Sequence, residues 1–432
     1  MSRTVAIATL GCKTNQFESA AMEERLKASG FTVVPFATGA SLVIVNSCTV
    51  TSATDAQSRN LIRKARRLNP DCRVVVTGCY AQVDPQALRE IPGVAVVLGN
   101  AEKRNFLDYL EEAGEGTRVA VSDIAAETEV PPLPLTAFAE RSRAFVQIQN
   151  GCNAFCSYCI IPYARGRSRS VRPDEVIEQI RTLTARGYAE VVLTGIHIGG
   201  YGLDLTPATS LPALVERIEG ETELSRLRLG SLEPTEISEA LIERMADDSA
   251  ILCPHFHIPL QAGDDAVLRR MNRPYDTRFF RDLVTRIHRR LPDAAIGLDL
   301  ITGFPGESDE EFAHTLELIA ELPVSHLHVF PFSRRPGTPA ATMPDQVHGS
   351  IVKERAARLR AMGERKHREF AQGFIGRTLE VVVERGVGRS ECRGLTRNYL
   401  NVLFPGNARL AGQRLPVTVG AWRDGALHGI PA

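Results

Sequence analysis

The 432-residue sequence predicts an α/β protein built from three parts. We expect an N-terminal parallel α/β domain, a partial (β/α)6 barrel in the middle and a small all-β barrel at the C-terminus. Two stretches of alternating strand-like and helical patterns predict the first two parts, because such alternation builds parallel sheets with helical crossovers. Short strand patterns between Gly, Asn and Pro turns predict the third part.

The N-terminal part shows apolar strand patterns of the kind found in buried parallel sheets. The expected strands are residues 5–10, 42–46, 73–77 and 94–98, with helices at 18–28 and 55–68 between them.

A cysteine follows each of the first three expected strands within two residues. These are Cys12, Cys48 and Cys79. Because the carboxyl ends of parallel strands lie along one edge of a sheet, we expect the three thiols to converge there. Cys72 lies in the loop before a strand and does not belong to this set, whereas Cys253 and Cys392 are expected to be buried small side chains.

A proline-rich stretch separates the first part from the second. Residues 130–135 read Val-Pro-Pro-Leu-Pro-Leu, which is typical of a semi-rigid linker. The resulting division of the chain is 1–122 for the first domain, 123–140 for the linker, 141–369 for the central domain and 370–432 for the C-terminal module.

The central part contains six strand patterns separated by helices and ends in a basic amphipathic helix at 352–369. Six parallel βα units favour an open barrel over a closed eight-stranded one. The expected strands are residues 145–149, 191–195, 226–231, 255–260, 296–302 and 326–332, and the clearest helices are 173–186, 276–290 and 310–321. In the C-terminal module the expected strands are 379–384, 399–404 and 415–422.

The spacing CxxxCxxC follows the first barrel strand, at Cys152, Cys156 and Cys159. Three thiolates suit a four-iron cluster that keeps one iron open, since such clusters normally take four protein thiolates. A zinc site would need a fourth ligand, which the neighbouring sequence does not supply. A disulfide is disfavoured by the odd number of cysteines, nine, and by the lack of a secretory signal. We therefore expect a reducing, cytoplasmic location. A membrane partner is not expected, because no run of 18 apolar residues occurs.

Three regions together resemble the methylthiotransferase family of radical S-adenosylmethionine (SAM) enzymes. The first carries T-L-G-C-K-T-N-Q-F-E-S, N-S-C-T-V-T and T-G-C-Y-A-Q, and the second runs from G-C-N-A-F-C-S-Y-C-I-I-P to P-F-S-R-R-P-G-T. The third, the tail, resembles the RNA-binding TRAM barrel of that family. The resemblance implies two [4Fe-4S] clusters and SAM as cofactors. One cluster would be held by Cys152, Cys156 and Cys159, and a sulfur-carrying cluster by Cys12, Cys48 and Cys79.

Residues beside the first cysteine distinguish branches of this family. The tRNA isopentenyladenosine branch typically reads G-C-Q-M-N there, and the ribosomal-protein aspartate branch reads G-C-P-K-N. This chain reads Gly11-Cys12-Lys13-Thr14-Asn15, which resembles the branch that methylthiolates carbon 2 of N6-threonylcarbamoyladenosine at position 37 of tRNA. The other two substrates remain alternatives. An iron–sulfur redox-sensing RNA-binding protein is an alternative from a different class.

The SAM contacts are expected at the ends of the barrel strands, and no separate catalytic side chain is assigned because the clusters and SAM carry the chemistry. Glu233 would accept from the SAM ribose or amino group, although an ordinary loop carboxylate is an equal alternative. His255 and His257 share one face of their strand and are expected to be structural. The candidate contacts are Gly195, Ser231, Glu233, Gln261 and Arg273.

The expected macromolecular partner is the anticodon loop of tRNA. The chain has no net charge, with 51 basic and 51 acidic residues, so any affinity must come from local patches. Eight arginines and four acidic residues lie between Arg377 and Asp424. This composition fits binding of single-stranded RNA and an ordinary solvated surface equally well. A flavodoxin- or ferredoxin-like electron donor is expected, whereas the sequence does not indicate the sulfur donor.

Overall fold

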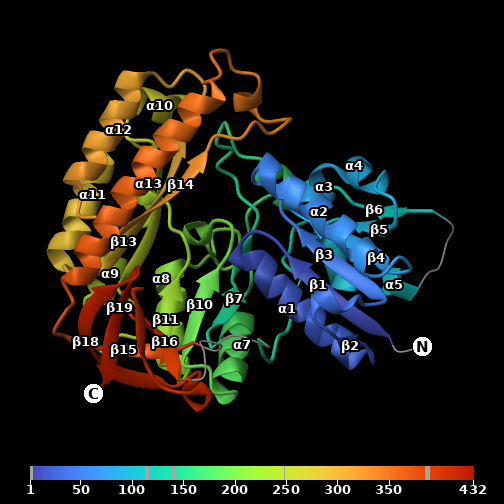
Figure 1. Cartoon of the computed structure of the whole chain (residues 1–432), viewed down its shortest axis with the longest axis horizontal. Helices are drawn as coiled ribbons and strands as arrows, with labels where there is room; N and C mark the ends of the chain where they lie inside the picture. The colour runs from blue at the N-terminus through green and yellow to red at the C-terminus, as the bar shows by residue number, and fades with distance from the viewer. Residues whose placement is uncertain (1–2, 112–115, 132, 139–141, 248, 385–389) are drawn as a thin grey trace.

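The computed structural model describes residues 3–111, 116–131, 133–138, 142–247, 249–384 and 390–432. It contains an N-terminal α/β domain, a central open barrel and a C-terminal β-barrel that packs beneath the central one (Figure 1). The predicted fold class is therefore confirmed. None of the described helices combines the length and the apolar character that crossing a membrane requires.

The N-terminal domain is a six-stranded parallel sheet of order β2-β1-β3-β4-β5-β6. All four predicted strands are present, and the two strands that sequence patterning missed, β2 and β6, are short edge strands. The strands are β1 (Thr4–Thr9), β2 (Thr32–Val33), β3 (Leu42–Ser47), β4 (Arg73–Gly78), β5 (Val94–Leu98) and β6 (Arg118–Ala120), and the helices are α1 (Lys13–Ala28), α2 (Ser52–Leu68), α3 (Cys79–Val83), α4 (Pro85–Arg89) and α5 (Asp108–Glu111).

Helices cover both faces of this sheet, which explains its uninterrupted apolar strands. On β3, Val43 and Val45 pack into the core on the α2 side, whereas Ile44 packs into the core that includes Met22 of α1. Thr51 closes a capping box at the start of α2, so this helix begins where the chain leaves the sheet. The α1 helix begins at Lys13, five residues before the predicted start.

The central domain is an open barrel of six parallel strands. Two three-stranded sheets, β11-β10-β7 and β12-β13-β14, meet through isolated bridges between β11 and the segment around β12. All six predicted strands are present. They are β7 (Ala144–Gln147), β10 (Glu190–Thr194), β11 (Arg226–Leu229), β12 (His255–Gln261), β13 (Ala295–Thr302) and β14 (His326–Pro331); a short antiparallel pair, β8 (Gln149–Asn150) and β9 (Arg169–Ser170), follows β7.

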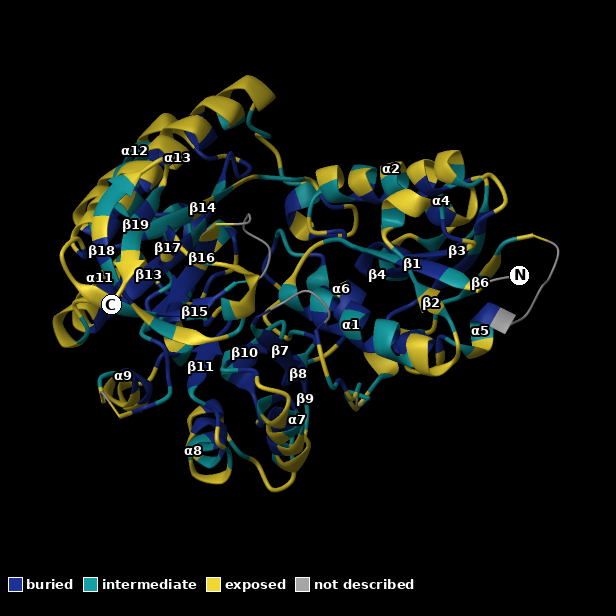
Figure 2. Ribbon diagram, turned by 60° about the horizontal axis from the view of Figure 1, so that its bottom comes forward, coloured by how far each residue is buried: buried dark blue, intermediate teal, exposed yellow. Residues whose placement is uncertain are grey.

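Amphipathic helices surround the barrel and expose their outer faces, while the strands are mostly buried (Figure 2). Strand β14 is the exception, with intermediate and exposed residues. The basic helix predicted at 352–369 is present as part of a longer α13 that packs on β14. The helices are α6 (Ile161–Arg165), α7 (Pro173–Ala185), α8 (Leu211–Glu221), α9 (Glu239–Met245), α10 (Asp265–Arg270), α11 (Thr277–Arg290), α12 (Asp309–Glu321) and α13 (Gly349–Gln372).

The C-terminal module is a closed five-stranded barrel of order β15-β16-β17-β19-β18. Two of its strands, β16 and β19, were not predicted, because their polar and glycine residues mask the alternation. The strands are β15 (Thr378–Val383), β16 (Glu391–Thr396), β17 (Asn401–Pro405), β18 (Arg414–Arg423) and β19 (Ala426–Pro431).

The turn after β16 closes the lower end of the central barrel. Arg228 of β11, fully buried, donates to the carbonyl oxygens of Thr396 (3.1 Å) and Arg397 (2.8 Å). Tyr399 in this turn has a φ of +67° and stacks on His255 of β12 with ring centroids 4.3 Å apart. The module is therefore joined to the central domain by buried polar contacts.

The proline-rich linker also packs against its neighbours over its described residues. Leu135 and Phe138 are buried in the central core. Thr136 donates from its hydroxyl group to Glu24 of α1 (2.6 Å). The domain boundaries after residues 122, 140 and 369 stay a prediction.

Candidate active site between two cysteine triads

The structure brings Cys12, Cys48 and Cys79 to one edge of the N-terminal sheet. They follow β1, β3 and β4, which are adjacent strands. Cys12 is exposed, whereas Cys48 and Cys79 are buried. Burial, with smaller contributions from the nearby Cys79 and Cys12, raises the pKa of the Cys48 thiol to about 12. A metal must therefore displace the proton from Cys48 to bind there.

Two glycines let the backbone close around this triad. Gly11 has a φ of +91°, and a Cβ at that position would lie 2.7 Å from Cys48 Sγ. Gly78 has a φ of +98°, and its Cβ would lie 2.3 Å from the carbonyl oxygen of Ser47. Only glycine fits both the conformation and the space.

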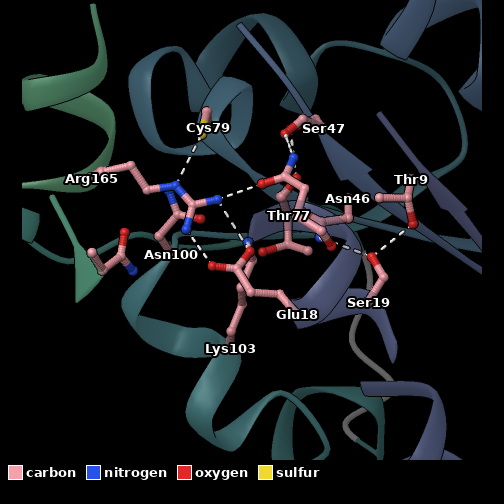
Figure 3. Close-up of polar contacts among 12 residues, drawn as sticks. Thr9, Glu18, Ser19, Asn46, Ser47, Thr77, Cys79, Asn100, Lys103 and Arg165 are labelled. Atoms are coloured by element: carbon pink, nitrogen blue, oxygen red, sulfur yellow. Dashed lines mark hydrogen bonds and ion pairs between the residues drawn. The ribbon is translucent and has the colours of Figure 1, made fainter. Parts of the chain in front are cut away.

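A buried arginine from the central domain reaches the N-terminal triad (Figure 3). Arg165 of α6 is fully buried and donates from Nε to Cys79 Sγ (3.2 Å). Its other nitrogens donate to Glu18 and to Asn15. Lys103 Nζ also lies 2.5 Å from Glu18. Burial by itself would raise the pKa of Glu18, but Arg165 and Lys103 outweigh it and lower that pKa to about 2.

This network leaves an excess of positive charge beside the cysteines. Arg165 and Lys103 share one carboxylate, that of Glu18, and Arg165 directs its remaining donor at the sulfur of Cys79. A buried cation surplus of this kind is stabilised by an anion. Cysteine thiolates bound to an iron–sulfur cluster supply such an anion, so the residues present fit the implied cluster.

The second triad lies on the loop between β8 and α6. Cys152 Sγ accepts from the amide of Ala154 (3.4 Å) and faces His197 Nδ1 at 3.8 Å. Cys156 Sγ accepts from Arg273 Nη1 (3.2 Å). Burial, with smaller contributions from the neighbouring Cys156 and Cys152, raises the pKa of Cys159 to about 12. The three thiols therefore share one small region at the top of the barrel.

The spacing of the sulfurs argues against zinc at either triad. Thiolates bound tetrahedrally to one zinc ion, with Zn–S bonds of about 2.3 Å, stand about 3.8 Å apart. Across the described part of the chain, the only three-residue group of His, Cys, Asp or Glu whose ligand atoms all lie within 4.8 Å of one another consists of histidines. Thiolates on separate corners of a four-iron cube stand farther apart, so both triads fit a cube better than one ion.

The predicted SAM contacts fall into two groups around the second triad. Arg273 joins Cys156 to Glu233, with which it forms an ion pair. Gln261 ends β12 with a φ of +69° and lines the same cavity as Cys159. These three predicted residues therefore lie together beside the cysteines.

The other two candidates have visible structural roles. A Cβ at Gly195 would lie 2.9 Å from the carbonyl oxygen of Gln149, so its backbone packs closely against the strand before the triad. Ser231 is exposed and bridges β11 to His257 of β12. That all five bind SAM stays a prediction.

A cavity of about 220 Å³ lies between the two triads. Its wall on one side is Val50 and Thr51, which follow Cys48, and on the other side is Cys159 with its neighbours. Ser52 and Ser333, whose hydroxyl groups are 3.1 Å apart, hold the two domains together at its edge. The complete lining is Val50, Thr51, Tyr158, Cys159, Ile160, Ile161, Gln261, Asp299, Ile301, Phe330, Pro331, Phe332 and Ser333.

Sequence reasoning missed the residues that join the triads. Arg165 and Glu18 are 147 positions apart. Glu18 belongs to the motif around Cys12, but no spacing in the sequence links it to Arg165. Gln149 was also missed, although its Oε1 accepts from the amides of Ile196 and His197 and so holds the loop beside Cys152. The one signal in the sequence for Gln149 is that a polar residue ends a buried strand.

Two family models match the chain, and each match contains one of the two cysteine triads. Residues 4–99 match the family described as Uncharacterized protein family UPF0004. Residues 146–319 match the Radical SAM superfamily.

Two similar solved structures support the fold alone. The radical S-adenosylmethionine methyltransferase TsrM from Kitasatospora setae, with cobalamin and a [4Fe-4S] cluster bound, aligns with a TM-score of 0.54 at 19% identity, over 79% of this chain and 77% of that one. The same protein with tryptophan and a SAM analogue bound gives 0.55 at 19% identity, over 79% and 75%.

Curated relatives cover nearly the whole chain. A threonylcarbamoyladenosine tRNA methylthiotransferase from Bacillus subtilis is 41% identical over 96% of this chain and 93% of its own length. The protein of the same name from Aquifex aeolicus is 38% identical, over 92% and 96%. A tRNA-2-methylthio-N(6)-dimethylallyladenosine synthase from Acidothermus cellulolyticus is 36% identical, over 90% and 79%. The chain therefore belongs to the methylthiotransferase family of radical SAM enzymes, with a [4Fe-4S] cluster and SAM as cofactors.

Proposed function

We propose that this protein inserts a methylthio group at carbon 2 of N6-threonylcarbamoyladenosine at position 37 of tRNA. The observation that carries the proposal is the cavity between the triads, whose walls come from the residues after Cys48 and from Cys159 with its neighbours. A substrate in that cavity would lie within reach of both proposed clusters. The names of the relatives from Bacillus subtilis and Aquifex aeolicus support the choice of nucleoside.

Carbon 2 of adenine carries a C–H bond that has no useful acidity, so a side-chain acid or base alone cannot exchange it for sulfur. When bound, SAM and the two clusters supply the carbon radical and the methylated sulfur that this exchange needs. The chain's own residues position and enclose these groups. Arg165 and Arg273 direct guanidinium donors at Cys79 and Cys156 and so fix the positions of these two sulfurs.

Part of the cavity wall is apolar. Ile160, Ile301, Phe330 and Phe332 line it with apolar surface. Such a wall protects a reactive carbon radical from side reactions with solvent. An anticodon loop can present its base there, because a splayed single-stranded base is already unstacked.

The C-terminal barrel is proposed to hold the tRNA. In the described part of the chain, Arg393, Arg409 and Arg423 are exposed and none of them has a hydrogen-bonded or ion-paired partner for its guanidinium group. By contrast, Arg377 pairs with Asp293 (2.9 Å) and Arg397 donates to the carbonyl oxygen of Leu252 (2.7 Å). Two arginines of the predicted patch, Arg385 and Arg389, lie outside the described residues.

We further propose that the protein works in the cytoplasm with a flavodoxin- or ferredoxin-like electron donor. Reduction of the cluster at Cys152, Cys156 and Cys159 requires an external electron source of low potential. The sulfur donor is left unassigned.

The test is mass spectrometry of tRNA nucleosides from cells with and without this gene. Loss of the 2-methylthio form of threonylcarbamoyladenosine, restored by the wild-type gene and not by a triple alanine variant of Cys152, Cys156 and Cys159, is the expected result. Persistence of that nucleoside, with loss of methylthio-isopentenyladenosine or of methylthio-aspartate in a ribosomal protein, would contradict the proposed substrate. It would leave the assignment to the methylthiotransferase family unchanged.

A further inference from the structure

The lumen of the central barrel contains a set of polar side chains below the cavity. We call Lys13, His257, Asp299, His326 and His328 the lumen cluster. His257 lies on β12, Asp299 on β13, and His326 and His328 on β14. Leu327, between the two β14 histidines, packs against Gly363 of α13 on the outside. Because side chains alternate along a strand, His326 and His328 face the lumen.

The three histidines converge, with ligand nitrogens all within 4.8 Å of one another. Gly297 makes this approach possible, since a Cβ there would lie 2.0 Å from His326 Nε2. His257 Nε2 lies 2.8 Å from Asp299. His326 Nδ1 lies 2.9 Å from the hydroxyl of Ser325, whereas its Nε2 is buried and has no partner. The cluster therefore contains unused hydrogen-bonding capacity.

Lys13 brings a positive charge to the same space. It is the first residue of α1, directly after Cys12, and within the described chain its ammonium group makes no hydrogen bond or ion pair. The charged groups that act on it most are Arg143, Arg228, Glu190 and Asp299. Arg226 and Arg228 pair with Glu190, and His257 contacts Asp299. Neither carboxylate pairs with Lys13. This lumen therefore suits an anion better than a cation.

The lumen cluster continues the wall of the cavity between the triads. Asp299 pairs in register with Pro259 and His328, and Ile301 pairs with Phe330 one layer higher. Asp299, Ile301 and Phe330 line the cavity. His328 is exposed although it faces the inside of the barrel, so open space extends down to the histidines. Asp299 lines the cavity and also belongs to the lumen cluster, so the two adjoin.

We propose that the lumen cluster binds the threonyl carboxylate and hydroxyl of the modified adenosine. Lys13 pairs with the carboxylate, and the imidazole nitrogens of His326 and His328 hydrogen-bond its oxygens. An isopentenyl group in the same place would leave the Lys13 ammonium and His326 Nε2 unpaired in a partly buried site, which costs binding energy. This inference rests on the proposed function and makes the lumen cluster the part of the site that selects the nucleoside.

The test uses reconstituted full-length enzyme and two anticodon stem-loop RNAs. One carries threonylcarbamoyladenosine, and the other carries its neutral carboxamide analogue. We expect the wild type to prefer the acid in kcat/KM by roughly 10- to 100-fold, the range of a charge-assisted hydrogen bond. Lys13→Met should lose that preference and react with the amide as the wild type does. Lys13→Arg should retain the preference because it keeps the cation.

The matched control is Lys27→Met, on the same helix, whose ammonium group pairs with Glu23 at the surface (2.6 Å). It should keep the wild-type preference. His328→Gln provides a second test if Lys13→Met does not fold, and a several-fold weaker preference for the acid is expected. Iron content and 5′-deoxyadenosine formation from SAM alone are measured for every variant, so that damage to a cluster is distinguished from loss of nucleoside recognition.

Other outcomes would overturn the proposal. An equal loss of rate on both RNAs, together with loss of iron, would assign Lys13 to support of the neighbouring cluster. Stoichiometric zinc that is lost in His326→Gln would make the histidines a metal site. A wild-type enzyme that cleaves SAM and modifies neither RNA would reject the proposed function itself, whereas modification of both with equal kcat/KM would reject only the lumen cluster.

Discussion

Replacing Arg165 with methionine tests whether the buried ion network holds the N-terminal triad in place. The variant removes the guanidinium group between Cys79 and Glu18 and keeps a side chain of similar length. The structure sets the magnitude, because the pKa of Glu18 is about 2 in the folded protein and about 4.3 in an unfolded chain. That difference corresponds to about 3 kcal/mol for Arg165 and Lys103 together. Removing one partner from a buried ion pair costs a similar amount, because it leaves the other charge unpaired.

The assay must report on the N-terminal sheet. The only tryptophan, Trp422, lies in the C-terminal barrel and does not report on this part of the chain. Hydrogen exchange of peptides from β1, β3 and β4 measures the local free energy of opening. We expect Arg165→Met to lower it by about 3 kcal/mol at pH 7, with a lower iron content at Cys12, Cys48 and Cys79.

Lys103→Met is the matched control, because it removes the other cation and leaves Glu18 paired with Arg165. Lys103→Met should lower the local free energy of opening by clearly less than Arg165→Met does. The pH dependence provides a second check: the folded pKa of Glu18 is depressed, so its stabilisation is fully present above about pH 5 and is lost as the pH falls toward about 2. The gap between wild type and Arg165→Met should therefore narrow below pH 5. Protection within about 0.5 kcal/mol of wild type, the scatter of ordinary surface substitutions, would refute the reasoning.

Two further predictions concern the metal content and the RNA surface. Anaerobically reconstituted protein should hold about eight irons, as two cubes of four, and triple alanine variants of either cysteine triad should each hold about half; stoichiometric zinc in place of iron would contradict this. Replacing three exposed arginines with glutamine should weaken tRNA binding and flatten its salt dependence by up to about 0.9 in log–log slope per lost phosphate contact, whereas an unchanged slope would return the barrel to a structural role. The three arginines are Arg393, Arg409 and Arg423.

The sequence alone predicted the features that depend on local patterns. The strands β1, β3 and β4 are continuous apolar runs, and a cysteine follows each. Because parallel strands end at a common edge, convergence of the three thiols follows from these positions. The CxxxCxxC spacing and the six barrel strands were readable for the same reason. Edge strands such as β2, with two residues, were not, because they are too short to show a period.

The long-range contacts were decided only by the tertiary structure. Arg165 meets Glu18 from 147 residues away, and Lys13 reaches a lumen whose histidines lie on β12 and β14. No periodicity links such positions, since side chains of these types occur throughout a chain with as many basic as acidic residues. Their pairing depends on how the N-terminal and central domains pack together and on the strand register within the barrel. The sequence by itself therefore determined where the metal-binding cysteines lie on their strands, whereas only the packing of the domains decided which buried charges surround them.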